Sequence, residues 1–373
     1  MEKPIYINDA SVVAAVKSFY DAQQQTYFEQ SNGSWISRIC SQNTVLLDTL
    51  ISENKNFQHL DRSVQLALLC SRSLKRVDKR TAVNIGSSRG ATALWEKNYD
   101  RFRESGTAPT TSSPLTTLGN ISSWVAQDLS LQGTAFSHSI TCATASHSIL
   151  NAIAWLQSGM TQSMIAGGSE APLTDFTISQ MKALRIYSRE NDTIPCKALD
   201  VDKNHNSMIL GEAAALFLLS LKSEKSLAKI VGYGSAIEQL NSATSVTESG
   251  ESLQESMRQA IKDHKSEEID VIITHAPGTI KGDLAEYRAI KAVFGKKHPH
   301  LCNNKWQLGH TLGASSALNL AMAIEMLQTE TIFKVPFLKE SFLNPRNEQR
   351  VPQRILINAT GFGGNAVSLL VEK

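Results

Sequence analysis

The stretch AFSHSITCATASHSILNAIAWL, residues 135–156, begins with the alternation typical of a strand and continues as a nearly apolar helix. Cys142 stands where the two patterns meet, so we expect it at the N-terminus of the helix. There the unpaired backbone N–H groups and the helix dipole would favour a thiolate and lower the pKa of the thiol. The same N–H groups could hold the oxyanion of an acyl adduct. The alternative is a buried structural cysteine, the commoner role of a lone cysteine.

The order of elements around this stretch recurs later in the chain. Residues 301–327, LCNNKWQLGHTLGASSALNLAMAIEML, again run from a strand through a polar loop into a helix rich in Ala and Ser. Residues 81–102 and 270–295 both run from a strand through a small-residue loop into a helix. This alternation indicates an α/β fold, although it is common to all α/β proteins. Its recurrence predicts an internal duplication into halves at residues 1–222 and 223–373.

The composition of the 373-residue chain is that of a globular protein, with 42% hydrophobic and 19% charged residues. A net charge of +2, with scattered Lys and Arg, argues against a nucleic-acid partner. A run of about 18 apolar residues is absent, so we expect no membrane-spanning helix, and no secretory signal is apparent. An odd number of cysteines without a C-x-x-C pair argues against a disulfide framework or a zinc site and favours the cytoplasm. These cysteines are Cys40, Cys70, Cys142, Cys196 and Cys302.

Two histidines stand where an α/β fold places ligands. His275 ends the strand-like run VIITH, and His310 opens a helix five residues after Lys305. Most histidines are ordinary surface or core residues, and we expect this of the histidines other than His275 and His310. His147, five residues beyond Cys142 inside the helix, is expected to be structural rather than catalytic.

The glycine-rich loop GFGGN, residues 361–365, permits unusual backbone angles and close approach of a ligand. Only nine residues follow Gly364, which leaves no room for the helix and second strand of a dinucleotide-binding unit. The loop GSSRG, residues 86–90, lacks the Gly-Lys-Ser/Thr of a phosphate-binding loop. Neither loop therefore predicts a nucleotide cofactor.

These residues stand in one chain in a characteristic order. Cys142 at a helix start, His275 in HAPGTIKGDLAE, Lys305 and His310 in NKWQLGHTLGA, and a terminal GFGG follow one another. The set resembles the β-ketoacyl-acyl-carrier-protein synthases of the thiolase-like superfamily. It is most similar to the type II elongating enzymes with a Cys-His-His site. The resemblance covers most of the chain from about residue 60. It implies a thiolase-like fold with duplicated α/β halves, layered α-β-α-β-α.

The resemblance also implies a role for each residue. Cys142 would be the nucleophile that takes an acyl chain from its carrier protein, and His275 and His310 would stabilise the enolate formed when malonyl-carrier protein loses CO2. Lys305 would keep the histidines neutral and pair with an acidic neighbour. The loop residues Phe362, as the gating residue and an oxyanion donor, and Gly363 would contact the substrate.

The expected partners also follow from the resemblance. The pantetheine arm of the acyl carrier protein would lie along Thr279. Neither a metal nor an organic cofactor is implied, and the family is dimeric through its sheet edge, as a homodimer or with a related ketosynthase subunit.

The chain departs from the family's pattern at four positions. Pro277 replaces the first of two threonines, and Thr360 replaces a Phe before the glycine loop, which would widen the acyl entrance. Asn365 stands where a Thr is usual, and Asn319 stands where Glu usually supports the lysine. These departures predict a specialised ketosynthase, of the polyene or aryl-polyene/flexirubin pigment type, rather than a housekeeping enzyme.

Three other functions are open at this stage. A non-catalytic chain-length subunit usually lacks the nucleophile, whereas Cys142 is present here. A thiolase-like acyltransferase would need a second cysteine near the C-terminus, and none follows Cys302. The third alternative is a scaffold protein with a site that is no longer used.

Overall fold

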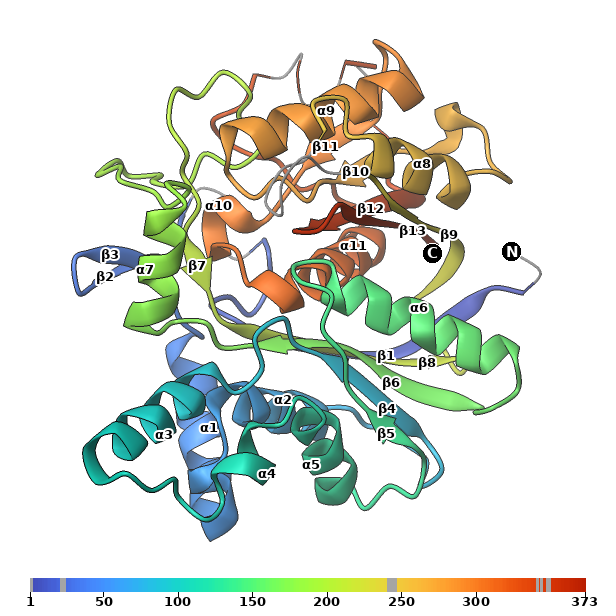
Figure 1. The fold of residues 1–373 in the computed structure, drawn as a ribbon. Helices are drawn as coiled ribbons and strands as arrows, with labels where there is room; N and C mark the ends of the chain where they lie inside the picture. The colour runs from blue at the N-terminus through green and yellow to red at the C-terminus, as the bar shows by residue number, and fades with distance from the viewer. Residues whose placement is uncertain (1–2, 21–24, 240–246, 340–341, 343–344, 347–349) are drawn as a thin grey trace.

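A ten-stranded sheet runs through the whole protein (Figure 1). The computed structural model describes residues 3–20, 25–239, 247–339, 342, 345–346 and 350–373. The strands follow one another across the sheet as β11-β10-β12-β13-β9-β1-β8-β6-β4-β5. In the first half they are β1 (Ile5–Val13), β4 (Ala82–Gly86), β5 (Ala135–Phe136), β6 (Ser163–Glu170) and β8 (Ala213–Ser220). In the second half they are β9 (Ala228–Ile237), β10 (Val271–Ile273), β11 (His300–Cys302), β12 (Arg354–Gly361) and β13 (Asn365–Glu372).

The two halves repeat one strand order. The orders β5-β4-β6-β8-β1 and β11-β10-β12-β13-β9 match strand for strand in sequence as well as in space. All four neighbouring pairs of each half also agree in direction. β5–β4 and β4–β6 are parallel like β11–β10 and β10–β12, while β6–β8 and β8–β1 are antiparallel like β12–β13 and β13–β9. The expected duplication of the α/β unit is therefore confirmed.

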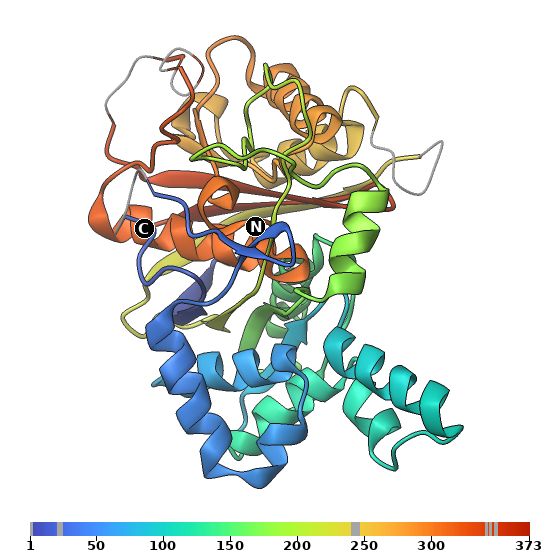
Figure 2. The same ribbon diagram turned by 90° about the vertical axis from the view of Figure 1, so that its left-hand side faces the viewer.

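Two helices form a central layer between the halves of the sheet (Figure 2). They are α6 (Thr144–Gln157) and α11 (Ser315–Thr329), the helices that the sequence predicts after the two related strands. Both lie in one hydrophobic core that also takes side chains from the strands of both halves. Ala and Ser on these helices let them approach each other and the sheets closely, because small side chains leave the backbones free to meet.

Outer helices complete the layers. The first half is covered by α2 (Arg62–Arg72) and α5 (Asn120–Asp128), and the second by α8 (Glu251–Ala260) and α9 (Ile280–Phe294). In β8, Phe217 faces the central core while Leu216 and Leu218 face the outer one, as the alternation of a strand requires. The predicted α-β-α-β-α layering is confirmed.

The remaining elements lie around the layers. They are β2 (Glu29–Ser31), β3 (Ser34–Ser37), β7 (Leu210–Gly211), α1 (Ser41–Glu53), α3 (Thr92–Ser105), α4 (Ser112–Thr116), α7 (Asp175–Ala183), α10 (Lys305–Leu308) and three short 3-10 turns, η1 (Lys55–His59), η2 (Ser266–Glu268) and η3 (Leu312–Ala314). β2, β3 and β7 form a small second sheet. Among the described residues, no helix is long and apolar enough to cross a membrane.

The predicted halves meet within the continuous sheet. A boundary at residues 222 and 223 falls between β8 and β9, and β1 hydrogen-bonds to both of those strands. The exact division of the chain therefore stays a prediction.

Candidate active site

Cys142 lies in the tight turn between β5 and α6. The helix begins at Thr144, so Cys142 stands two residues before it, close to the predicted place. The Thr144 hydroxyl accepts from the N–H of Ile140 at 2.8 Å and donates to the carbonyl of Thr141 at 2.5 Å. Thr141 has a positive φ of 47°, a strained angle for a threonine. The turn is thus fixed in one shape around Cys142.

The thiol of Cys142 is protonated at rest. Burial, together with the negative charge of Glu170, raises its pKa to about 12, against the positive charge of Lys305, which lowers it. The expectation of a lowered thiol pKa is therefore wrong, because loss of water around the sulfur outweighs the favourable charges. A base has to take the proton when the sulfur reacts.

His275 and His310 lie together as a pair. His275 follows β10 and His310 follows α10, and their ring centroids are 5.3 Å apart at an interplanar angle of 81°. Burial, together with the nearby charge of Lys305, lowers the pKa of both rings well below the usual value. Both are neutral at physiological pH, so each can donate or accept a proton.

The backbone around the pair is strained and tightly held. The N–H groups of His275 and Ala276 donate to the two carboxylate oxygens of Glu286 at 2.8 and 2.7 Å. The N–H of His310 donates to the carbonyl of Ile209 at 2.6 Å. Ala276 and Leu312 both have positive φ angles, 23° and 41°. Strained non-glycine residues beside Cys142, His275 and His310 fit a functional site.

Lys305 is completely buried at the start of α10. Burial lowers the pKa of its ammonium group to about 8, against the opposing charges of Glu286 and Asp283. Its Nζ has no hydrogen-bond partner among the described residues, and none of their ion pairs includes it. The expected ion pair is therefore wrong. Asn319 is buried too and donates to the carbonyl of Thr274 at 3.3 Å.

The glycine loop between β12 and β13 closes over the Cys142 turn. A Cβ on Gly361 would lie 3.0 Å from the backbone nitrogen of Cys142. The Thr141 hydroxyl donates to the carbonyl of Phe362 at 3.2 Å. The Phe362 side chain is 38% exposed, and Gly363 has a φ of 90°. The structure therefore brings the loop and the nucleophile candidate together, as predicted.

The family follows from these observations and from the sequence match. The family "Beta-ketoacyl synthase, N-terminal domain" matches residues 58–225, and "Beta-ketoacyl synthase, C-terminal domain" matches residues 227–338. The chain belongs to the β-ketoacyl synthase family. The predicted resemblance is confirmed, and so is the thiolase-like fold.

Known proteins are similar over nearly the whole β-ketoacyl synthase chain. The 3-oxoacyl-[acyl-carrier-protein] synthase 2 of Staphylococcus aureus (strain COL) is 27% identical, covering 86% of this chain and 84% of its own. The solved structure of the ishigamide ketosynthase/chain length factor superposes with a TM-score of 0.84 at 17% identity, covering 100% and 99% of the two chains. A type II polyketide ketosynthase, bound to its acyl-carrier protein and a hexaketide, has a TM-score of 0.82 at 17% identity and 99% coverage of both chains.

Thr279 has a structural task in this β-ketoacyl synthase. It caps α9, where its hydroxyl accepts from the N–H of Gly282 at 3.2 Å. The neighbouring Asp283 is buried, pairs with Lys203 at 2.6 Å and accepts from the N–H of Gly278 at 3.0 Å. The loop that would meet pantetheine is thus held rigid, while a substrate contact by Thr279 stays a prediction.

Sequence reasoning missed Glu170. This fully buried carboxylate accepts from the hydroxyl of Ser87, the N–H and hydroxyl of Ser88, and the N–H groups of Arg89 and Gly313, at 2.6–3.2 Å. It ties three separate chain segments together beside Cys142. The available signal was a single Glu at the end of the otherwise apolar run SMIAGGSE.

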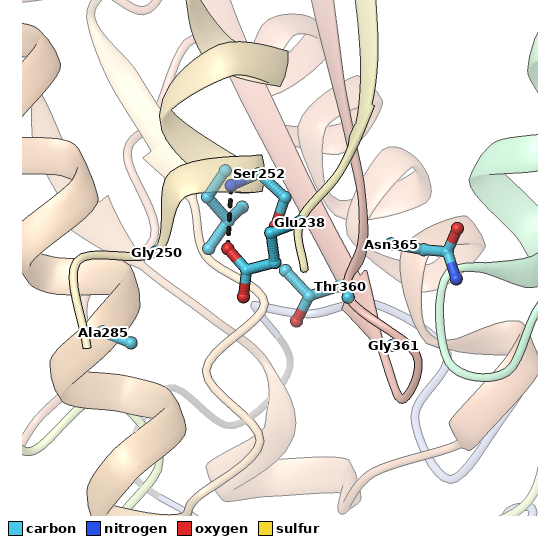
Figure 3. A pocket seen from close by; sticks show the side chains of 9 residues that line it. Glu238, Gly250, Ser252, Ala285, Thr360, Gly361 and Asn365 are labelled. Atoms are coloured by element: carbon cyan, nitrogen blue, oxygen red, sulfur yellow. Dashed lines mark hydrogen bonds between the residues drawn. The ribbon is translucent and has the colours of Figure 1, made fainter. Parts of the chain in front are cut away.

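A small pocket lies behind the glycine loop (Figure 3). Glu238 lines it, accepts from the N–H of Ser252 at 2.9 Å and donates its own N–H to the carbonyl of Gly364 at 3.1 Å. Thr360 also lines this pocket, whereas Cys142 and the two histidines do not. Glu238 therefore anchors the back of the loop, and a wider acyl entrance at Thr360 stays a prediction.

Gly361→Ala is expected to slow acylation of the protein at least about tenfold. The added Cβ would lie 1.9 Å from the Thr141 hydroxyl and 3.0 Å from the Cys142 nitrogen, so the turn must move. The measurement is the rate of acyl transfer from an acyl thioester, followed by intact mass. Gly119→Ala is the matched control, because a Cβ there meets nothing within 4 Å. An unchanged rate in Gly361→Ala would contradict the close approach of loop and turn.

Proposed function

We propose that this chain catalyses the decarboxylative condensation of an acyl group with malonyl-carrier protein. The observation that supports it most is a pair of neutral histidines in ring contact, next to a buried lysine whose charge also acts on Cys142. The donors, the positive charge and the thiol that this reaction needs come from separate segments of the chain and meet here. No metal or organic cofactor enters the proposal.

In the first half-reaction Cys142 takes the acyl group. One neutral histidine accepts the thiol proton while the sulfur attacks the thioester carbonyl. The N–H groups of Cys142 and Phe362 would hold the oxyanion, since the glycine loop and the turn lie against each other. The bond from the carbonyl carbon to the pantetheine sulfur then breaks, and that sulfur leaves with the proton.

In the second half-reaction malonyl-carrier protein loses CO2. The electron pair of the broken C–C bond moves onto the thioester oxygen, where His275 and His310 donate hydrogen bonds to the enolate. The enolate carbon attacks the acyl-Cys142 carbonyl, and the Cys142 sulfur leaves. The product on the carrier is a β-ketoacyl chain two carbons longer. Burial, and after it the charge of Lys305, lowers the pKa of both histidines, which keeps them in the neutral form that this step needs.

The alternatives fit the structure less well. A non-catalytic chain-length subunit has no need of Cys142 with two neutral histidines. A thiolase needs a second reactive cysteine, but Cys302 lies in the central core, where burial raises its pKa far above the usual value. The site therefore favours carbon–carbon bond formation.

The proposed partners and location rest on the same function. An acyl carrier protein would deliver both substrates, and the chain would act as a homodimer or with a related ketosynthase subunit. The five free cysteines favour the cytoplasm as the place of action. A polyene or flexirubin-type product stays a prediction.

Intact-mass measurement tests the proposal directly. Incubation with a panel of acyl-carrier proteins is expected to add one acyl group to the protein, and peptide mapping should place it on Cys142. The Cys142→Ala variant should remain unmodified, whereas Cys40→Ala should still be acylated because Cys40 lies at the start of α1. A complete lack of adduct with every chain length would overturn the enzyme function.

A further inference from the structure

The backbone of Arg89 is held by Glu170, whose charge acts on the Cys142 thiol. Arg89 belongs to the loop after β4, and its N–H donates to a carboxylate oxygen of Glu170 at 3.2 Å. Glu170 also binds Gly313, and its charge acts on the Cys142 thiol. The position of Arg89 is thus set by the same buried carboxylate that holds the loops of the site together.

The Arg89 side chain reaches from this carboxylate to α7. Its Nη2 donates to the side-chain oxygen of Gln180 at 2.7 Å. Its Nε is buried and has no hydrogen-bond partner among the described residues, and no carboxylate of those residues forms an ion pair with it. A guanidinium group has five donors in a planar fork, and in Arg89 the Nε–H is the one shown as buried without an acceptor among the described residues.

The neighbours of Gln180 on α7 line an apolar cluster around the thiol. We name it the Cys142 cluster, and Cys142 packs against its buried members. These members are Ile36, Ile178, Met181, Tyr187, Met208, Leu210 and Leu312. The loop of Arg89 is linked to this cluster through Glu170, which also accepts from the N–H of Gly313, the residue after Leu312. An acyl chain attached to Cys142 would meet these apolar side chains, since Cys142 packs against them.

We propose that Arg89 binds an oxygen acceptor on the acyl chain held by Cys142. A plain alkyl chain would leave the buried N–H unpaired and press hydrocarbon against a positive charge. A keto, phenolic or carboxylate oxygen beyond the thioester carbonyl would accept from it in a charge-assisted hydrogen bond. The substrate class is therefore an oxygenated acyl chain. This inference rests on the proposed function, because the chain must first be attached to Cys142.

The alternative is a purely structural Arg89 that ties its loop to α7 through Gln180. The two roles differ in what they do to substrate choice. A site built to pair a polar group discriminates strongly against the analogue that lacks it, whereas a structural tie changes all substrates equally. The ratio of rates between matched substrates therefore separates the two.

The experiment compares thioesters of equal chain length on one pantetheine analogue. Octanoyl, 3-oxo-, 5-oxo- and 7-oxo-octanoyl and 7-carboxyheptanoyl thioesters are given separately, and the rate of Cys142 acylation is followed by intact mass. We expect at least one oxygenated chain to react at least about tenfold faster than octanoyl, a difference of about 1.4 kcal/mol. The three keto chains show at which distance from the thioester the oxygen acceptor is preferred. The 7-carboxyheptanoyl chain tests whether a charged acceptor is preferred.

The variants assign the preference to Arg89. Arg89→Met should bring the rate ratio to within about twofold of one, and Arg101→Met, an exposed arginine on α3, should keep the wild-type ratio. Equal rates for octanoyl and all oxygenated chains in the wild type would overturn the inference even if Arg89→Met failed to fold. An unchanged ratio in folded Arg89→Met would also overturn it. Acylation by no thioester at all would instead overturn the proposed function.

Discussion

Malonyl decarboxylation is expected to continue in Cys142→Gln and to fall by about 100-fold to 1,000-fold when His275→Ala is added. Decarboxylation puts negative charge on the thioester oxygen, and the sulfur of Cys142 takes no part in that step. The Gln side chain would fill the space of an acylated cysteine. His275 donates to the developing oxyanion, so its loss removes one of the two preorganised donors. The measurement is release of CO2 from malonyl-carrier protein.

His310, the second histidine of the pair, offers the first control. His310→Ala should cause a loss of similar size, because the two rings are in contact and both are held neutral. His264→Ala is the matched surface control, since that side chain lies near Glu268, outside the site. Decarboxylation that persists at the starting rate in both ring variants would contradict enolate stabilisation by the pair. Far-UV circular dichroism should confirm that each variant remains folded.

The sequence predicts well which residues form the candidate site, but it predicts their pKa values poorly. Cys142, His275 and His310 could be named because each stands where a strand or a helix begins or ends, which is a local pattern. The direction of the thiol pKa shift depends on how much water the folded chain excludes, and no local pattern contains that information. Sequence reasoning missed Glu170 for the same reason, because its hydrogen-bond partners come from two distant segments, residues 87–89 and Gly313.

The folded arrangement also decides details of secondary structure. The strand expected before Cys142 is only two residues long, Ala135–Phe136, and the residues between it and Cys142 are mostly irregular. Residues 103–119 are rich in Ser, Thr, Pro and Gly, a composition typical of a loop, yet Ser112–Thr116 within them form α4. The duplication was easier to predict, because the order of elements survives when residue identity is lost.

Asn319→Glu is expected to shift the alkaline limb of the pH–rate profile to higher pH by about one unit or more. Lys305 and Asn319 are both fully buried, and burial lowers the Lys305 pKa to about 8. A lysine with a lowered pKa loses its charge as the pH rises through that value. The two histidines stay neutral at high pH without that charge, so the loss above about pH 8 would come from the missing attraction between the Lys305 ammonium group and the negative charge on the enolate. A carboxylate at position 319 would favour the ammonium form and keep it charged to higher pH.

The control is Asn319→Gln, which changes the size of the side chain without adding charge and should leave the limb near pH 8. Lys305→Met should remove the limb, since no titrating ammonium group remains, and should lower the rate at every pH. The measurement is condensation rate at saturating substrates between pH 6 and 10. A limb that stays in place in Asn319→Glu but moves in Asn319→Gln would show that packing, rather than charge at Lys305, sets the pH dependence. If the limb moves in Asn319→Glu and not in Asn319→Gln, the residue at position 319 sets the Lys305 pKa. That pKa then sets the upper end of the pH range in which this enzyme works.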